Sequence, residues 1–287
     1  MKEKNCSFPA PVVFRHRTFD FSKRSYIMGV LNVTPDSFSD GASYYDPDAA
    51  IRHGMEMAEQ GADIIDVGGE STRPGADPVA LDEEIKRIEP VIRELSKRID
   101  VPISIDTTKA DTAKRALDAG AEIINDISAL RVDSEMAAAA VSYDAVVVLM
   151  HMLGSPRTMQ KDIGYESLIN DIYSFLKERI DLAVDRGVKQ NKIIIDPGIG
   201  FGKSVEKDNF EILGKITRFC DLGQPVLVGV SRKAFIGKLL DADIDARDMG
   251  TAAASAIAIH NGANIVRVHN VEQMKIAAKV ADAVLRA

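Results

Sequence analysis

A short apolar run followed by a longer segment of helical periodicity recurs along the chain. Eight such runs, rich in Ile and Val, lie at residues 26–31, 64–67, 103–105, 123–124, 145–150, 193–195, 226–230 and 265–268. Their apolar character is continuous rather than alternating, which is typical of strands buried on both faces of a parallel sheet. The pattern therefore predicts eight parallel strands.

The segments between these runs predict helices with clear boundaries. Asp46 stands at an N-cap position with Pro47 as the first helical residue, and the apolar stripe that follows ends at Gly61. Glycine recurs just before two later runs, at Gly120 and Gly262. Glycine can end a helix in the left-handed region, so each of these residues is expected to close a helix and lead into a strand.

Eight strand-helix units in about 260 residues match a (β/α)₈ TIM barrel, an α/β fold, in number, order and length. Residues 1–24 are then a short N-terminal extension packed on the barrel, and residues 25–287 form a single domain. A doubly wound open sheet is the alternative. It normally has fewer strands and a glycine-rich dinucleotide turn after the first one, and residues 29–34 (GVLNVT) are not such a turn.

Composition excludes several classes of function. Of 287 residues 46% are hydrophobic, and 36 Lys and Arg stand against 43 Asp and Glu, a net charge of −7. We therefore expect small-molecule partners, with no general affinity for nucleic acid or an anionic membrane. Cys6 and Cys220 cannot form a disulfide framework or a thiolate zinc site. Without a signal-like or membrane-spanning apolar run, a cytoplasmic location is expected.

Every predicted strand ends in polar side chains, and a barrel gathers those ends at one mouth. In chain order they are Asn32; Asp66 with Glu70; Asp106; Asn125 with Asp126; His151; Asp196; Ser231, Arg232 and Lys233; and Arg267 with His269. A single polar strand end is no more than ordinary solvation. Eight of them around one cavity indicate a site for a polar ligand.

Part of this set suits a flat, nitrogen-rich ring. Asp106, Asn125 and Asp196 supply carboxylates and an amide that can pair with such a ring and fix its orientation. On this reasoning, the ring of the expected ligand is a pterin or a purine. A zinc site of the acids' own is a competing explanation, but the chain has only five histidines and no His-Glu-x-x-His motif.

Another part of the set suits an anion. Arg73, Lys233, Arg267 and His269 form a positive group within an acidic protein, and that combination is typical of a phosphate or diphosphate site. Asn32 near a diphosphate could give an oxygen ligand to Mg²⁺, which uses few protein ligands and keeps several waters. The expected cofactor is therefore Mg²⁺, with Asn32 as its protein ligand.

Glycine-rich segments border the predicted mouth. Residues 32–41 and 68–76 have the Gly and Pro punctuation of hinged loops, which ordinary surface turns share. Phe201 lies between Gly200 and Gly202, and its ring either packs locally or covers a flat ligand. The flanking glycines favour the second reading.

Several separated motifs make the chain resemble the dihydropteroate synthase family from about Phe19 to the end. They lie at 28–41 (MGVLNVTPDSFSDG), 69–75 (GESTRPG), 125–128 (NDIS), 149–152 (LMHM), 196–203 (DPGIGFGK), 231–233 (SRK) and 267–269 (RVH). The resemblance implies a barrel transferase that joins 6-hydroxymethyl-7,8-dihydropterin diphosphate to 4-aminobenzoate, giving 7,8-dihydropteroate and diphosphate. Members are usually homodimers, use Mg²⁺ and are targets of sulfonamides.

The family's pattern also implies roles for individual residues. Those implied to hold the pterin are Asp106, Asn125, Asp196, Lys233 and Met150. Those implied to serve the diphosphate are Arg267, His269 and Asn32, the last through Mg²⁺. Those implied to border the aminobenzoate are Thr72, Arg73, Pro74, Phe201 and Lys233. The residues expected to act on the reacting groups are Asp106, Lys233, Arg267 and Arg73.

The electronics of the implied reaction favour a dissociative substitution without a covalent enzyme intermediate. The aromatic amine is a neutral nucleophile near pH 7, so no strong general base is needed.

Two positions depart from the family. Ala234 stands where a serine often contacts the aminobenzoate carboxylate, which leaves backbone groups for that role, and Asn270 stands where Asp is common.

Two other readings stay open at this point. A corrinoid-dependent methyltransferase that uses methyltetrahydrofolate is also a pterin-binding barrel, but it gives Asn32, Arg73 and Arg267 no shared purpose. A non-catalytic pterin-binding module is the other reading, and the intact motifs at 32–41 and 70–75 argue against it.

Overall fold

The eight apolar runs form one parallel sheet that closes on itself as a barrel. The structure is a computed structural model that describes residues 8–34, 46–71 and 75–287. The strands are β3 (Tyr26–Asn32), β4 (Ile64–Gly68), β5 (Ile103–Asp106), β6 (Ile123–Asp126), β7 (Val146–Met150), β8 (Ile193–Asp196), β9 (Leu227–Val228) and β10 (Ile265–Val268). β10 pairs with both β3 and β9, and a parallel bridge between Ile195 and Val226 joins β8 to β9. The predicted TIM barrel is confirmed.

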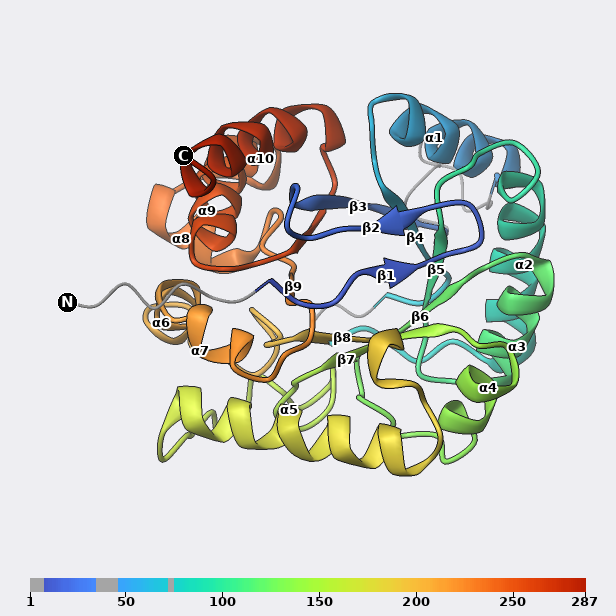
Figure 1. The fold of residues 1–287 in the computed structure, drawn as a ribbon, viewed down its shortest axis with the longest axis horizontal. Helices are drawn as coiled ribbons and strands as arrows, with labels where there is room; N and C mark the ends of the chain where they lie inside the picture. Colours follow the sequence, from blue (N-terminus) through green and yellow to red (C-terminus); the bar gives the residue numbers. More distant parts are fainter. Residues whose placement is uncertain (1–7, 35–45, 72–74) are drawn as a thin grey trace.

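Helices surround the barrel as an outer layer (Figure 1). They are α1 (Pro47–Glu59), α2 (Leu81–Leu95), α3 (Ala110–Ala119), α4 (Met136–Ser142), α5 (Leu168–Asp185), α6 (Asp208–Gly214), α7 (Thr217–Cys220), α8 (Ala234–Leu240), α9 (Asp248–His260) and α10 (Val271–Leu285), with 3₁₀ turns η1 (Gln190–Lys192) and η2 (Ile244–Arg247). Within the described ranges, no helix combines the length and apolar character needed to cross a membrane.

Local sequence signals set the boundaries of these elements. The Asp46 carboxylate accepts hydrogen bonds from the backbone N–H groups of Asp48 and Ala49, so it is the N-cap of α1 as predicted. Gly61, Gly120 and Gly262 have φ values of 96°, 116° and 111°. The left-handed conformation expected at each helix-to-strand junction is therefore confirmed.

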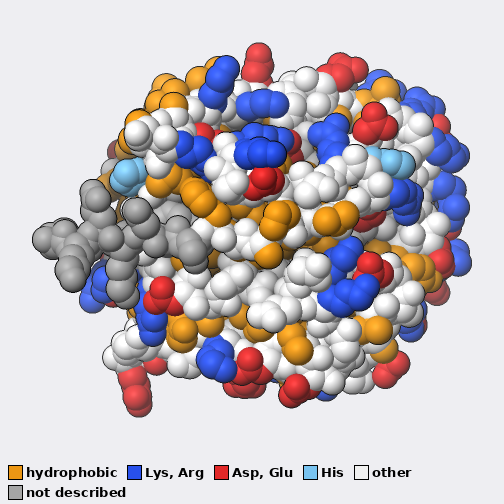
Figure 2. Space-filling view, in the orientation of Figure 1, with side chains coloured by type: hydrophobic (Ala, Val, Ile, Leu, Met, Phe, Trp, Pro, Cys, Tyr) orange, Lys and Arg blue, Asp and Glu red, His pale blue; other side chains and the backbone are white. Residues whose placement is uncertain are grey.

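A hairpin of β1 (Val12–Val13) and β2 (Thr18–Phe19) covers the N-terminal end of the barrel, in front of the strands in Figure 1. Phe19 stacks on Tyr26 of β3 with ring centroids 4.0 Å apart, and the hairpin's apolar side chains join the barrel interior. Figure 2 shows this side of the molecule, with apolar side chains in a band across the middle and charged ones around it. A ligand site inside the barrel must therefore open at the opposite, C-terminal end.

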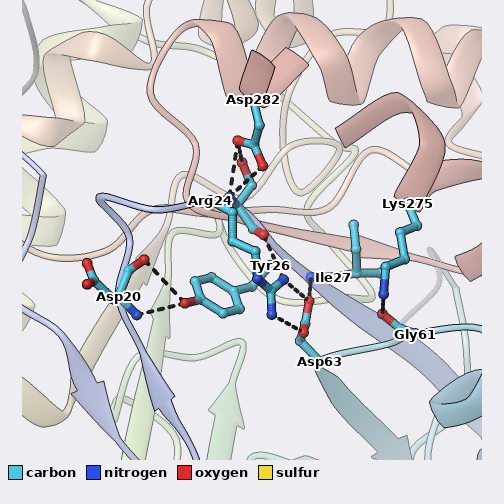
Figure 3. Close-up of polar contacts among 9 residues, drawn as sticks. Asp20, Arg24, Tyr26, Ile27, Gly61, Asp63, Lys275 and Asp282 are labelled. Carbon is cyan, nitrogen blue, oxygen red and sulfur yellow. Dashed lines mark hydrogen bonds and ion pairs between the residues drawn. The ribbon is translucent and has the colours of Figure 1, made fainter. Parts of the chain in front are cut away.

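The segment that joins the hairpin to β3 is held by partly buried polar contacts (Figure 3). Arg24 makes a bidentate pair with Asp63, at 2.7 and 2.8 Å, and Asp63 also accepts the backbone N–H of Ile27. Ser25 donates its backbone N–H and hydroxyl to Asp282 of α10. These contacts join the start of β3 to both β4 and α10.

Candidate active site

An arginine and two carboxylates occupy the C-terminal end of the barrel interior. Arg267 of β10 donates from Nε to Asp66 Oδ2 at 2.6 Å and from Nη2 to Asp106 Oδ2 at 2.8 Å. Asp66 is fully buried and Asp106 nearly so. Among the described residues, Asp66 Oδ1 and Asp106 Oδ1 have no hydrogen-bond partner, and the third guanidinium nitrogen, Nη1, donates to none. The site therefore keeps acceptors and one donor group for a ligand.

Asp66 also sets the orientation of Asn125. The Asn125 amide nitrogen donates to Asp66 Oδ2 at 3.1 Å. An ionised carboxylate can only accept, so the NH₂ group must face Asp66 and the amide oxygen must face away. Asn125 therefore presents an acceptor, which suits the N–H groups of a pterin ring. The sequence analysis counts Asp66 among the strand ends at the mouth but assigns it no ligand, although a carboxylate inside the apolar run 64–67 requires a buried partner.

Asp196 ends β8 with half of its carboxylate committed to the following loop. Its Oδ1 accepts the backbone N–H of Gly198 at 2.7 Å, and Oδ2 accepts no hydrogen bond from the described residues. Burial raises the pKa of Asp196, and the positive charge of Lys233 opposes the rise. The second carboxylate oxygen is therefore available to a ligand.

Lys233 reaches the same space from the turn after β9. Its ammonium donates to the carbonyl oxygen of Ile199 and lies 4.6 Å from the centroid of the Phe201 ring. A Cβ atom at Gly200 would lie 3.0 Å from Lys233 Cδ, so glycine permits this close approach. Burial lowers the pKa of Lys233 to about 8, against the effect of Asp196. Asp196, Lys233 and Phe201 are thus neighbours, as predicted.

A strained turn holds Lys233 in place. Arg232 has a φ of 58°, in the left-handed region that a non-glycine residue rarely adopts. Its guanidinium makes a bidentate pair with Asp248 of α9, at 2.8 and 2.9 Å, and Asp248 also accepts from the Asn270 amide at 3.0 Å. Asn270 in turn caps α10 by accepting the backbone N–H of Gln273. These contacts link the turns that follow β9 and β10.

Apolar side chains line the other side of the mouth. Met150 packs with Ile127, Met152 and Met159, and Phe201 rests partly buried against this cluster. A cavity of about 290 Å³ opens beside it, bordered by Asp106, Ile127 and Met152 among others. Met150 itself is buried within this cluster, and Phe201 is packed against it while staying partly exposed.

The remaining expected ligands lie at the ends of β3 and β10. The Ser231 hydroxyl contacts His269 Nδ1 at 2.9 Å and accepts the His269 backbone N–H, which fixes the histidine beside Arg267. The partly exposed Asn32 ends β3, where its backbone pairs with Gly68 of β4, and its side chain makes no hydrogen bond to the described residues. The described residues hold no cluster of three His, Cys, Asp or Glu side chains that could bind a metal. A cation here would take one amide oxygen from the chain, which fits Mg²⁺ completed by water and phosphate oxygens and does not fit zinc.

Other strand ends are committed to the fold instead of the mouth. Both carboxylate oxygens of Asp126 accept backbone N–H groups of the following turn, from Ser128 and Leu130. The His151 ring packs on Phe175 of α5. Glu70 pairs with Lys109, although it still borders the cavity beside Asp106. The expectation that all eight ends face one cavity is thus too broad, because side chains alternate in direction along a strand.

The expected residues Thr72, Arg73 and Pro74 lie outside the described part of the chain. The same holds for residues 35–41 of the first predicted loop.

The carboxylates in the interior predict a pH-dependent stability. Burial raises the pKa of Asp106 to about 7 from an ordinary 3.8, although Arg267 opposes the rise. Between these values the folded protein holds a proton that the unfolded chain has released, so stability falls as pH rises. Relative to Asp106→Asn, the free energy of unfolding should fall by roughly 1 kcal/mol per pH unit from about pH 4 to 7 and then level off. Urea unfolding of both proteins at several pH values measures this, and a rise over that range would contradict it.

Known proteins resemble this chain over nearly its whole length. Residues 28–269 match the family model described as pterin binding enzyme. The dihydropteroate synthase of Synechocystis is 48% identical over 97% of this chain and 96% of its own, and that of Bacillus subtilis is 46% identical over 92% and 90%. The Xanthomonas albilineans dihydropteroate synthase solved with 4-aminobenzoic acid has a TM-score of 0.90 at 41% identity, covering 98% of this chain and all of the other. The same enzyme solved with 7,8-dihydropteroate has a TM-score of 0.86 at 37% identity. The chain therefore belongs to the dihydropteroate synthases within the pterin binding enzyme family.

Proposed function

We propose that this transferase joins 6-hydroxymethyl-7,8-dihydropterin diphosphate to 4-aminobenzoate, releasing diphosphate and forming 7,8-dihydropteroate. One observation carries the proposal: three hydrogen-bond acceptors lie at the same end of the barrel as the cationic side chains Arg267 and Lys233. The acceptors are Asp196 Oδ2, the amide oxygen of Asn125 that faces away from Asp66, and the Asp106 carboxylate. Acceptors in this number suit the N–H groups of a pterin, and the cations suit its diphosphate. Relatives solved with 4-aminobenzoic acid and 7,8-dihydropteroate support the same pair of substrates.

In this proposal the pterin enters the barrel with its ring between the acceptors and Met150. Asp196 accepts from the amidine-like edge of the ring, and Asn125 accepts from a further N–H. Lys233 donates to a ring acceptor, since its ammonium lies near Asp196. Asp106 contacts Arg267, and its ionised form, which a pKa of about 7 leaves populated at neutral pH, stabilises positive charge that develops on the methylene carbon.

The leaving diphosphate is assigned to the rim. Arg267 keeps Nη1 free of described partners, and Ser231 holds His269 beside it. Both donate to phosphate oxygens as the C–O bond breaks, so the charge on the leaving group is stabilised. Asn32 would hold Mg²⁺ by its amide oxygen, and the bound ion would supply further charge neutralisation to the diphosphate. Arg73 is also assigned to the leaving diphosphate.

The amine site is assigned to Phe201, Lys233 and the residues Thr72, Arg73 and Pro74. The aminobenzoate nitrogen attacks the methylene carbon with its lone pair, a C–N bond replaces the C–O bond, and one amine proton leaves with the diphosphate or to water. The amine is neutral near pH 7, so the side chains have to orient it and exclude water rather than deprotonate it. Relatives from Yersinia pestis are solved with sulfonamide drugs, and we propose that sulfonamides compete for this amine site here.

One assay tests the proposal. Diphosphate release from the pterin diphosphate should require 4-aminobenzoate and should yield dihydropteroate in equal amount. A sulfonamide should raise the apparent KM for 4-aminobenzoate. Release that is independent of the amine, or no release at all, would contradict the assigned reaction.

Chelation should separate activity from stability. Because the proposed ion acts on the diphosphate and receives a single ligand from the chain, EDTA should abolish turnover while the melting temperature of the ligand-free protein stays within about 1 °C. Added Mg²⁺ should restore turnover. A large loss of thermal stability on chelation would indicate a structural metal instead.

We also propose a homodimer through α9 and α10, which pack side by side (Figure 1). Large apolar side chains on these helices are exposed, at Met249, Ile257, Ile276, Val280 and Val284. Exposed apolar clusters of this kind are typical of protein interfaces. Ile257→Glu should convert a dimer to a monomer in sedimentation velocity, whereas Val184→Glu, at an exposed apolar position on α5, should not.

A further inference from the structure

Lys203 is a fully buried lysine to which the proposed chemistry gives no role. It is the last residue of the motif 196–203 that follows β8, and it is 0% exposed. The Nζ atom lies 2.7 Å from His151 Nδ1, 3.2 Å from the His151 carbonyl oxygen and 2.9 Å from the Phe201 carbonyl oxygen. Three acceptors match the three N–H donors of an ammonium, and the negative charge of Asp196 favours that form, although burial lowers the pKa of Lys203 well below its usual range.

His151 fits the role of acceptor. Burial, with the positive charges of Lys203 and Arg131, lowers the pKa of His151 to about 2, so the ring is neutral and Nδ1 can accept. The ring packs edge-to-face on Phe175, with centroids 4.8 Å apart. The histidine is therefore anchored to α5 on one side and holds the lysine on the other.

The loop wrapped around Lys203 carries groups that face the mouth. Gly198, with a φ of 70°, passes so close to His151 that a Cβ atom there would lie 1.8 Å from the histidine carbonyl oxygen. From the same loop the Ile199 carbonyl accepts from Lys233, and the Phe201 ring lies beside the Lys233 ammonium. Lys203 thus holds the loop from its inner side, and Asn209, Tyr165 and Gln160 add hydrogen bonds to Gly200 and Gly202.

We propose that Lys203 and His151 are positioning residues that hold the loop 197–202 against the end of β7 and thereby set Phe201 and Lys233 for the amine substrate. Strand ladders hold the backbones of Asp196 and Asn125, and one contact, from the Gly198 N–H to Asp196 Oδ1, joins Asp196 to this loop. Loss of the contact between Lys203 and His151 should therefore affect the amine site, which depends on both Phe201 and Lys233, more than the pterin site, which shares Lys233 but keeps Asn125 and Asp106. The assignment of those two sites rests on the proposed function, whereas the holding of the loop does not.

Hydrogen-exchange mass spectrometry tests the holding of the loop directly. In Lys203→Met and His151→Phe, amides in 197–204 should exchange at least about tenfold faster than in the unchanged protein. His151→Asn places a side-chain acceptor near the position of Nδ1 and should restore slow exchange. Lys207→Met, at an exposed lysine of the same segment, is the matched control and should change nothing.

Kinetics test the consequence. Lys203→Met should raise the KM for 4-aminobenzoate at least about tenfold, while calorimetric affinity for a pterin diphosphate analogue stays within about threefold. If Lys203 only stabilised the fold, the variant would have a smaller active fraction and a lower kcat, while the KM for 4-aminobenzoate would stay unchanged.

Unchanged exchange in Lys203→Met would overturn the proposal. So would slow exchange in His151→Phe with fast exchange in His151→Asn, because ring packing would then hold the loop. If Lys203→Met does not fold, this pair of histidine variants decides. If the unchanged protein does not use 4-aminobenzoate, the proposed function fails, and the exchange result still decides whether Lys203 holds the loop.

Discussion

Arg267→Met is expected to lower the free energy of unfolding by about 3 kcal/mol, the lower end of the range for breaking a buried ion pair. The variant leaves Asp66 and Asp106 without the guanidinium that both contact, at 2.6 and 2.8 Å, in a region where water reaches neither carboxylate freely. The lower end applies because the Arg267 side chain is 23% exposed. Urea unfolding at pH 7 measures the effect.

An exposed arginine provides the control for this stability change. Arg98 pairs with Glu94 on the surface of α2 and its following turn, with side chains 49% and 32% exposed. Arg98→Met should cost less than about 1 kcal/mol. Adding Asp66→Asn to Arg267→Met should recover part of the loss, because one buried charge is removed. Equal costs for the two arginines would show that the buried carboxylates do not depend on Arg267.

Asp196→Asn is expected to weaken pterin diphosphate binding by about 2–4 kcal/mol, which is roughly 30-fold to 1,000-fold in Kd. The amide oxygen can still accept the Gly198 N–H that Oδ1 accepts now. The NH₂ group then replaces the available Oδ2 acceptor and faces ring N–H groups, so donors meet donors. The charge that supports the Lys233 ammonium is lost as well.

Calorimetry with a pterin diphosphate analogue measures this affinity. Asp221→Asn, at a surface ion pair with Arg218, should leave Kd unchanged and controls for a general effect of the lost charge. Unchanged affinity in Asp196→Asn would remove Asp196 from the pterin site.

The strands were predictable because both of their faces are buried, which leaves continuous apolar runs in the sequence. The run 226–230 became only the two-residue β9, since Val226 makes just an isolated bridge to Ile195 and residues 229–233 turn toward the site. Helix boundaries followed from Asp46 and the left-handed glycines, whose preferences are local.

The site was predictable in its residue types and not in its pairings. Neighbours on one strand diverge: Asn125 points into the barrel and contacts Asp66, whereas Asp126 caps its own turn. Successive side chains of a strand point in opposite directions, and the register of the strand decides which of them face the barrel interior. Composition does not reveal that register. Lys203 stood in a recognised motif, but its three acceptors are two backbone carbonyls and the ring of His151, which follows β7 far away in the sequence, so no sequence pattern predicts them.

The pairing of β3 with β10, and the contacts of Ser25 with Asp282, affect how the chain folds during synthesis. β3 is made early and its partner on one side is made last, so the nascent barrel has an open edge until β10 and α10 have left the ribosome. An open strand edge can pair with other chains. Ribosome-bound chains that stop before β10 should therefore be sensitive to proteases and depend on chaperones, and release of the last helix should bring both protection and closure of the barrel in one step.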